Sequence, residues 1–171
     1  MQTTAIPFTR LDLILTRWMA RHGVQFLRLS MGLVFLWFGG LKFFPGLSPA
    51  EDLAGRTIAM MTFGFIPASV SLPLLAIWEV TIGIGFLAGR CLRVTVLLMA
   101  GQMLGTVTPL FFFPHETFNA FPFAPTLEGQ YIIKNIVLLS AGLVLGAVVR
   151  GGRLVADPES AVPSRPADDR A

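Results

Sequence analysis

Three charged side chains lie at or within long apolar stretches of this sequence. Glu79 stands near the middle of one stretch, Lys134 lies inside another, and Lys42 stands at the end of a third. A charge in the hydrocarbon region costs roughly 2.5 to 3.5 kcal/mol, so each of these residues needs a partner inside the protein. A buried carboxylate beside an ammonium group can exchange a proton or orient a small anion. Chemistry is therefore expected where these side chains meet.

Depth along the helices predicts which of these charges meet. With a rise of about 1.5 Å per residue, Glu79 lies roughly 12 Å inside the outer end of its span. Lys134 lies about one turn inside the outer boundary of its own span, and its stem reaches further. The sequence thus predicts an ion pair between Glu79 and Lys134, the candidate catalytic residues, with Lys42 at the outer rim. Ligand-binding candidates around them are Lys42, Trp37, Trp78, Asn135 and Gln102, with Thr106 as a further neutral partner.

A structural interpretation of the same residues stays open. The charges could serve only to fix helix pairing, with both lysines extending toward headgroups, and for Lys42 alone we favour this interpretation. Glu79 is too short to reach an interface from mid-span, so a functional and a structural ion pair are equally compatible with the sequence. Packing is the favoured role of both tryptophans. Gln102 and Thr106 are expected to satisfy each other or backbone carbonyl groups.

Composition places the chain in a membrane. Of its 171 residues, 54% are hydrophobic and 13% are charged, which is too apolar for an ordinary soluble domain. The formal net charge of +3 comes from arginines near the ends of apolar stretches, so nucleic acid is not expected as a partner. The single Cys91 has no partner for a disulfide relay, and thiol chemistry is not expected.

Metal and haem sites are not expected either. His22 precedes the first span and His115 lies in an outer loop, so the two could not ligate one haem iron together. His115, Glu116 and Glu128 have no metal-binding spacing. The sequence therefore predicts no metal ligand and no covalently bound cofactor.

Four apolar segments are long enough to span a bilayer. They cover residues 24–41, 71–88, 92–113 and 131–149, each near the roughly 20 residues that a bilayer core requires. Backbone groups in lipid need internal partners, so these segments must be helices. The predicted fold is all-α, a four-helix transmembrane bundle with an N-terminal interfacial helix and a short outer-loop helix.

The bundle is expected to have a distinct segment at each end. Residues 1–23 should lie along the membrane surface, because apolar residues recur at helical spacing and Thr9 with Asp12 resembles a capping box. Residues 24–149 form the membrane domain. Residues 150–171 are rich in proline, small residues and charge, and they predict a disordered cytoplasmic tail.

Two outer loops connect the spans. In the first, Ser48, Pro49 and Glu51 predict an N-cap, an N1 proline and a capping-box carboxylate for a short helix reaching about Met61. In the second, residues 113–125 mix phenylalanine with proline and predict an irregular aromatic segment at headgroup depth rather than a helix. Arginines concentrate on the other flanks, which favours cytoplasmic termini and outer loops on the opposite side.

Small residues predict close contacts between helices. In the first span a face with charges and glycines should point into the bundle; its members are Arg28, Gly32, Phe35, Gly39 and Lys42. Glycines also recur four apart in the other spans, at Gly85 and Gly89, Gly101 and Gly105, and Gly142 and Gly146.

Four segments carry a distinctive pattern: residues 28–46 (RLSMGLVFLWFGGLKFFPG), 78–93 (WEVTIGIGFLAGRCLR), 108–118 (TPLFFFPHETF) and 129–146 (GQYIIKNIVLLSAGLVLG). Together they resemble the DoxX-like membrane family, most closely its YkgB-type branch. The most specific parts are the Gly-Leu-Lys-Phe sequence around Lys42, the glutamate Glu79, and Lys134 followed by Asn135. The resemblance implies four spans in the bacterial inner membrane. It also links some members to quinone-coupled thiosulfate oxidation and the YkgB-type branch to survival of reactive chlorine stress.

Three functions remain open at this point. The first is a redox-linked subunit, or an oxidative or reactive-chlorine stress protection protein, whose buried charges bind a quinone or a small oxyanion. Its electrons would come from a redox partner protein. The second is a non-catalytic assembly protein in which the same charges are structural, and a homo-oligomer is compatible with either. A small transporter is least favoured, because one such bundle leaves little room for a pore.

Overall fold

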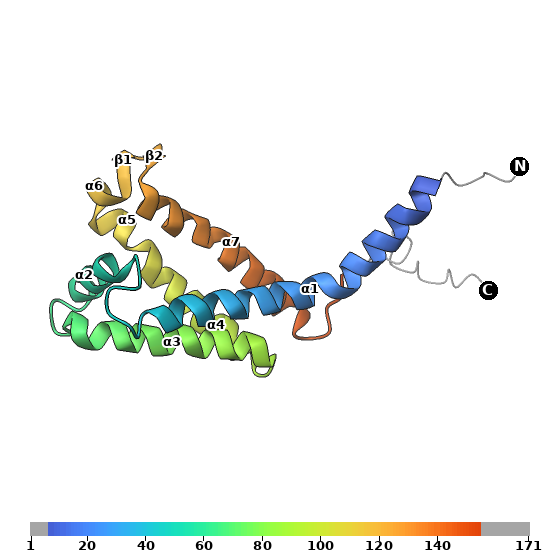
Figure 1. Cartoon of the computed structure of the whole chain (residues 1–171), viewed down its shortest axis with the longest axis horizontal. Helices are drawn as coiled ribbons and strands as arrows, with labels where there is room; N and C mark the ends of the chain where they lie inside the picture. The colour runs from blue at the N-terminus through green and yellow to red at the C-terminus, as the bar shows by residue number, and fades with distance from the viewer. Residues whose placement is uncertain (1–6, 155–171) are drawn as a thin grey trace, which may run out of the picture.

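The chain folds into long apolar helices with short elements gathered at one end. The computed structural model describes residues 7–154, and within its first helix it describes side chains from Leu11 onward. Figure 1 shows the long helices α1, α3, α4 and α7, with the other elements at one end of them. In chain order the elements are α1 (Pro7–Leu41), α2 (Glu51–Met61), α3 (Ala68–Ala88), α4 (Leu92–Val107), α5 (Pro109–Phe112), α6 (Pro114–Thr117), β1 (Phe118–Ala120), β2 (Ala124–Pro125) and α7 (Leu127–Val148).

The four predicted spans are confirmed as helices. Within residues 7–154, four helical stretches are long and apolar enough to cross a membrane: Leu11–Leu41, Ala68–Ala88, Leu92–Phe112 and Leu127–Val148. The predicted all-α, four-helix architecture is therefore correct. The second and fourth spans begin three to four residues earlier than the hydropathy pattern indicated.

The first helix is longer than predicted. α1 runs without a break from Pro7 to Leu41, so the interfacial segment is continuous with the first span. No proline follows Pro7 within α1, and Gly23 alone does not interrupt a helix. The first turns of α1 project beyond the other helices (Figure 1). The capping box predicted at Thr9 lies outside the described side chains, and the predicted tail lies outside the described residues from position 155 on.

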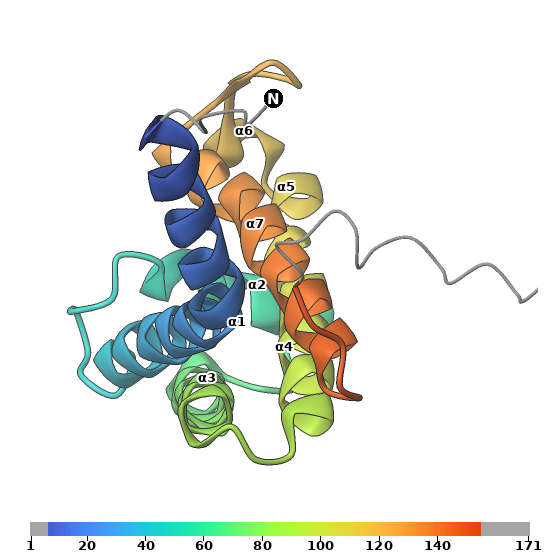
Figure 2. The same cartoon turned by 90° about the vertical axis from the view of Figure 1, so that its right-hand side faces the viewer.

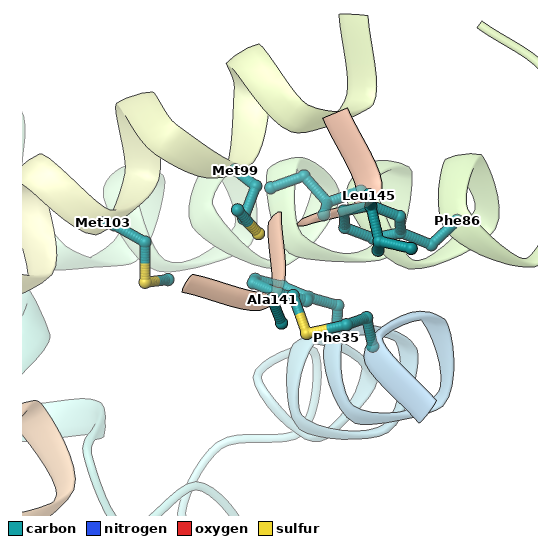
Figure 3. Packing of buried hydrophobic residues seen from close by; sticks show 8 residues of the cluster. Phe35, Phe86, Met99, Met103, Ala141 and Leu145 are labelled. Atoms are coloured by element: carbon teal, nitrogen blue, oxygen red, sulfur yellow. The ribbon is translucent and has the colours of Figure 1, made fainter. Parts of the chain in front are cut away.

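One apolar cluster joins all four long helices. The rings of Phe35 and Phe86 lie with their centroids 6.3 Å apart, and Met99 is fully buried beside them. Figure 3 shows side chains of this cluster converging from different helices. Large apolar residues on the outer faces stay exposed, as expected for helices surrounded by lipid. The cluster consists of Met31 and Phe35, Ile82 and Phe86, Met99 and Met103, and Ala141 and Leu145.

The most extensive helix contact joins α1 and α3, and glycines permit it. A Cβ atom added to Gly83 would lie 2.6 Å from the backbone nitrogen of Leu36, so the two backbones approach closely. A Cβ atom added to Gly39 would lie 2.6 Å from the Cβ atom of Glu79. Gly32 is likewise buried against α3. The inward direction predicted for this face of α1 is therefore confirmed.

The other glycine pairs were predicted with mixed success. Gly85 lies against Thr95, and Gly142 lies against Met99, so both mark close contacts with α4. A Cβ atom on Gly105 would meet no neighbour within 4 Å, which shows that a spacing of four does not identify an interface by itself.

The loop between α1 and α3 contains the expected short helix with a different start. α2 ends at Met61 as predicted, but its N-cap is Ala50 and no side chain caps it. Glu51 reaches back to accept a hydrogen bond from the Gly46 backbone N–H at 2.6 Å. The predicted Ser48 cap is wrong because the turn that Glu51 closes shifts the helix start past Ser48.

The loop between α4 and α7 is more regular than predicted. Pro109 and Pro114 each begin a single helical turn, because proline lacks only an N–H that a first turn does not use. β1 and β2 then pair antiparallel, with Phe118 opposite Pro125. The prediction of an entirely irregular segment is therefore wrong.

Two adjacent glycines near the end of α1 give a matched test of this packing. Gly39→Ala should lower the free energy of unfolding by about 1 to 3 kcal/mol, because the added methyl group overpacks the contact with Glu79. Gly40→Ala should leave it unchanged or raise it by up to about 1 kcal/mol, because nothing lies within 4 Å and alanine favours a helix. Denaturant titration in detergent measures both, and equal effects would contradict the packing.

Candidate functional site

Glu79 binds two donors inside the bundle. The Lys42 ammonium group donates to Glu79 Oε2 at 2.6 Å, and the Gln102 amide Nε2 donates to Glu79 Oε1 at 2.5 Å. The three residues come from the end of α1, the middle of α3 and the middle of α4. Figure 2 shows α3 lying beside both α1 and α4, as this arrangement requires. We call Lys42, Glu79 and Gln102 the Glu79 cluster.

The Glu79 cluster is nearly sealed from the surroundings. The side chains of Lys42 and Glu79 are 10% and 9% exposed. Gln102 is 8% exposed. A carboxylate can remain charged in such a place when both its oxygen atoms accept hydrogen bonds and an ammonium group balances the charge.

Local backbone structure explains how Lys42 reaches Glu79. Lys42 follows the last residue of α1, and its N–H donates to the Gly39 carbonyl at 3.2 Å, which continues the helical turn. Lys42 therefore stays on the face that carries Gly39. Because Gly39 has no side chain, the two backbones approach closely enough for the ion pair to form at the buried interface.

The predicted pair of Glu79 with Lys134 is wrong. Lys134 is exposed on α7, and its ammonium nitrogen lies 5.4 Å from the centre of the Tyr131 ring. α3 packs on α1 and α4, whereas α7 packs on α4 and α1. Depth placed Lys134 near the level of Glu79, but depth does not determine which helices are neighbours. The prediction that Lys42 extends to the headgroups is also wrong, because its ammonium group binds Glu79.

The other candidate residues lie around the cluster or away from it. Trp37 is 64% exposed on the outer face of α1 and does not join the cluster. The Trp78 indole donates to the Leu98 carbonyl at 3.0 Å and so links α3 to α4 next to Glu79. Asn135 is half-buried on α7. A ligand-binding role for these residues remains a prediction.

Gln102 leaves one buried atom without a partner. Its Oε1 is the only buried side-chain nitrogen or oxygen atom within the described part of the chain that has no hydrogen-bond partner. Thr106 does not supply one, because its hydroxyl donates to the Met103 carbonyl at 3.0 Å. The expectation that Gln102 and Thr106 satisfy each other is therefore wrong, while that of a backbone partner for Thr106 is confirmed.

Arg28 has a structural role on the inward face of α1. Its Nη1 donates to the carbonyl groups of Phe86 and Leu87 at 2.6 and 3.0 Å, near the C-terminal end of α3. Gly89 ends that helix with a φ of 68°, and a Cβ atom there would collide with the Arg28 guanidinium. A cation at the C-terminal end of a helix is favourable. Arg28 therefore stabilises the end of α3 and is not part of the Glu79 cluster.

A second ion network joins the loop between α1 and α3 to the loop between α4 and α7. Arg56 on α2 binds both oxygen atoms of Glu116 on α6, at 2.7 and 2.6 Å, and donates to Asp52 at 3.0 Å. Its guanidinium carbon lies 5.0 Å from the centre of the Phe113 ring. Hydrogen bonding to Arg56 lowers the pKa of Glu116, and the same contact raises the pKa of Arg56. Sequence reasoning missed this pair because the two residues lie in different loops.

An open hollow of about 530 Å³ lies at the same end of the molecule. Gly46, Glu51, Arg56 and Leu72 are among its lining residues, and no member of the Glu79 cluster lines it. Among the described residues, no three His, Cys, Asp or Glu side chains gather in a way that could hold a metal ion.

Comparison with known families identifies the chain. The family model named DoxX matches residues 23–116, more than half of the sequence. The chain belongs to the DoxX family. Comparisons with curated proteins and with solved structures give no match. The matched DoxX region contains the whole Glu79 cluster and ends before Lys134, and the predicted YkgB-type branch is not confirmed.

Two lysine substitutions test the observed pairing. Lys42→Met should destabilise the protein by about 3 to 5 kcal/mol, because it leaves the Glu79 carboxylate buried without a counter-charge. Lys134→Met is the matched control and should change the free energy of unfolding little, because Lys134 is exposed. Denaturant titration in one detergent compares the two variants. A larger loss of stability in Lys134→Met than in Lys42→Met would instead support an ion pair between Glu79 and Lys134.

The ion network of Arg56, Glu116 and Asp52 should be sensitive to acid. The pKa of Glu116 is lowered from 4.5, so its pairing with Arg56 stabilises the folded state fully above pH 4.5. This contribution is lost as the pH falls below 4.5 through the lowered pKa. The difference in thermal midpoint between the wild type and Glu116→Gln should therefore be constant above pH 5 and shrink in acid. A difference that grows in acid would contradict this sign.

Proposed function

We infer that this DoxX-family membrane protein is a redox-linked subunit of the bacterial inner membrane, and that its Glu79 cluster binds the headgroup of a quinone. A small oxyanion is the other ligand that suits a buried ammonium group. The termini lie in the cytoplasm on this proposal, because arginines concentrate on their side of the bundle. Protection from reactive chlorine, which the resemblance to one branch implies, stays a prediction.

The unused hydrogen-bonding groups of the cluster support this ligand. The Lys42 ammonium group has three N–H donors, and in the described part of the chain only Glu79 accepts from it. Gln102 Oε1 is an acceptor without a donor. A quinone carbonyl accepts hydrogen bonds, and the hydroxyl group of a hydroquinone donates one. A headgroup that changes between these forms can accept from Lys42 and donate to Gln102. These two unused groups are the observation that carries the proposal.

Glu79 would hold the proton in this reaction. It lies between an ammonium group and an amide, so it is oriented and within reach of a ligand that touches either. Interconversion of quinone and hydroquinone moves both protons and electrons, and the electrons would pass to or from a redox partner protein. The chain itself contributes binding, orientation and a proton site.

A second candidate function is supported by the completeness of the ion pair. Both oxygen atoms of Glu79 already have partners within the chain, and the cluster ties three helices together. On this alternative the charges fix helix pairing, and the protein acts by assembling with a partner or with further copies of itself.

The test replaces the whole charge pair rather than half of it. The double variant Glu79→Gln with Lys42→Met should fold, because removing both partners of a buried ion pair leaves no unpaired charge. In lipid nanodiscs it should bind a short-chain quinone at least about tenfold more weakly than the wild type, a loss of about 1.4 kcal/mol. Tryptophan fluorescence or calorimetry measures this binding.

The controls separate the two functions. Lys134→Met should bind the quinone like the wild type, because Lys134 does not contact the cluster. If the wild type and the folded double variant bind equally, or if neither binds, the quinone proposal fails and the assembly function is favoured.

A further inference from the structure

The turn after α2 has an unusual residue at its tightest position. The Gly64 N–H donates to the Ala59 carbonyl at 2.7 Å, and the Phe63 N–H donates to the Met60 carbonyl at 3.3 Å. These are the paired hydrogen bonds of a Schellman motif, which ends a helix with one residue in the left-handed region. Glycine normally occupies that position. Here Phe63 occupies it with a φ of 51°.

The ring of Phe63 gains nothing inside the described chain that would offset this strain. Phe63 is 90% exposed, and Phe65 in the same turn is 86% exposed. They are among the most exposed large apolar side chains of the described residues. A large ring in a left-handed conformation costs more than glycine would, so the contact that favours it lies outside the described residues.

We propose that the turn formed by residues 62–66, here the Phe63 turn, inserts its two aromatic rings into the bilayer interface on the side of α2. The turn lies at one end of the bundle and leads directly into the spanning helix α3 (Figure 1). No charged residue occurs between Arg56 and Glu79, so the turn continues the uncharged surface of that helix. Aromatic rings next to the end of a span suit the boundary between headgroups and acyl chains.

This anchor would hold α2 from its far end. At its start, α2 is fixed by the hydrogen bond between Glu51 and Gly46, and in its middle by the contact of Arg56 with Glu116. At its end, Met61 accepts a hydrogen bond from the Thr108 hydroxyl at 3.6 Å. The Phe63 turn beyond Met61 has no such partner among the described residues, so the bilayer completes the attachment. The inference does not depend on the proposed function.

Depth-dependent fluorescence quenching tests whether lipid covers the Phe63 turn. The background is Cys91→Ser, which removes the only cysteine, and a fluorescent label is placed at Phe65→Cys. The matched control is a label at Ala50→Cys, an exposed position at the other end of α2. The full chain is studied in phosphatidylethanolamine and phosphatidylglycerol vesicles that carry a nitroxide on the upper acyl chain.

The label at position 65 should be quenched by the lipid nitroxide and protected from iodide in water by about threefold relative to position 50. Quenching by iodide alone would overturn the proposal. Protection from both quenchers would also overturn it, because a second copy or another protein would then cover the turn.

Two substitutions of Phe63 separate the ring from the backbone. In the labelled protein, Phe63→Ala should shift the label at position 65 toward iodide, because Phe63 is the one inserted ring that remains after Phe65→Cys. In detergent, Phe63→Gly should have a thermal midpoint a few degrees above that of Phe63→Ala, because glycine removes the left-handed strain. If neither substitution changes the quenching at position 65, Phe63 is not an anchor and the proposal fails.

Discussion

The charge of Glu79, buried among three helices, is the constraint on which this bundle depends. A carboxylate at mid-span cannot reach water, so the protein must supply donors to both of its oxygen atoms. Lys42 and Gln102 do so from α1 and α4. Because each donor lies on a different helix, satisfying one side chain fixes the relative position of all three helices. The apolar cluster could tolerate small shifts that these hydrogen bonds would not.

The glycines of α1 and α3 are part of the same constraint. The hydrogen bonds to Glu79 form only if the backbones approach closely, and Gly39 and Gly83 remove the side chains that would prevent this. The short distance between the two backbones also determines which side chain pairs with Glu79. Lys42 stands one residue beyond the end of α1, yet it is buried because the neighbouring helix extends further along the bundle at this end.

The sequence was sufficient for features set by one helix at a time. Hydropathy located four spans, and spacing predicted that Gly32 and Gly39 face inward, because both depend only on the periodicity of a single segment. It was insufficient where two segments must be placed side by side. The predicted ion-pair partner of Glu79 is Lys134, whereas the structure has Lys42. The contact of Arg56 with Glu116 is not predicted at all. Depth can be counted along a sequence, but helix neighbours follow from packing of whole faces.

The unpartnered oxygen of Gln102 follows from the charge of Glu79. A glutamine amide has a donor end and an acceptor end, and beside an ionised carboxylate the donor end must face it. The acceptor Oε1 is then directed elsewhere and stays unsatisfied. If Glu79 takes up a proton, the new O–H group can donate, and rotation of the amide would offer Oε1 to it. Gln102 can therefore hydrogen-bond to either form of Glu79, which a hydrocarbon side chain at this position could not do. A purely structural ion pair also needs Gln102, because its amide supplies the donor to the second oxygen atom of Glu79.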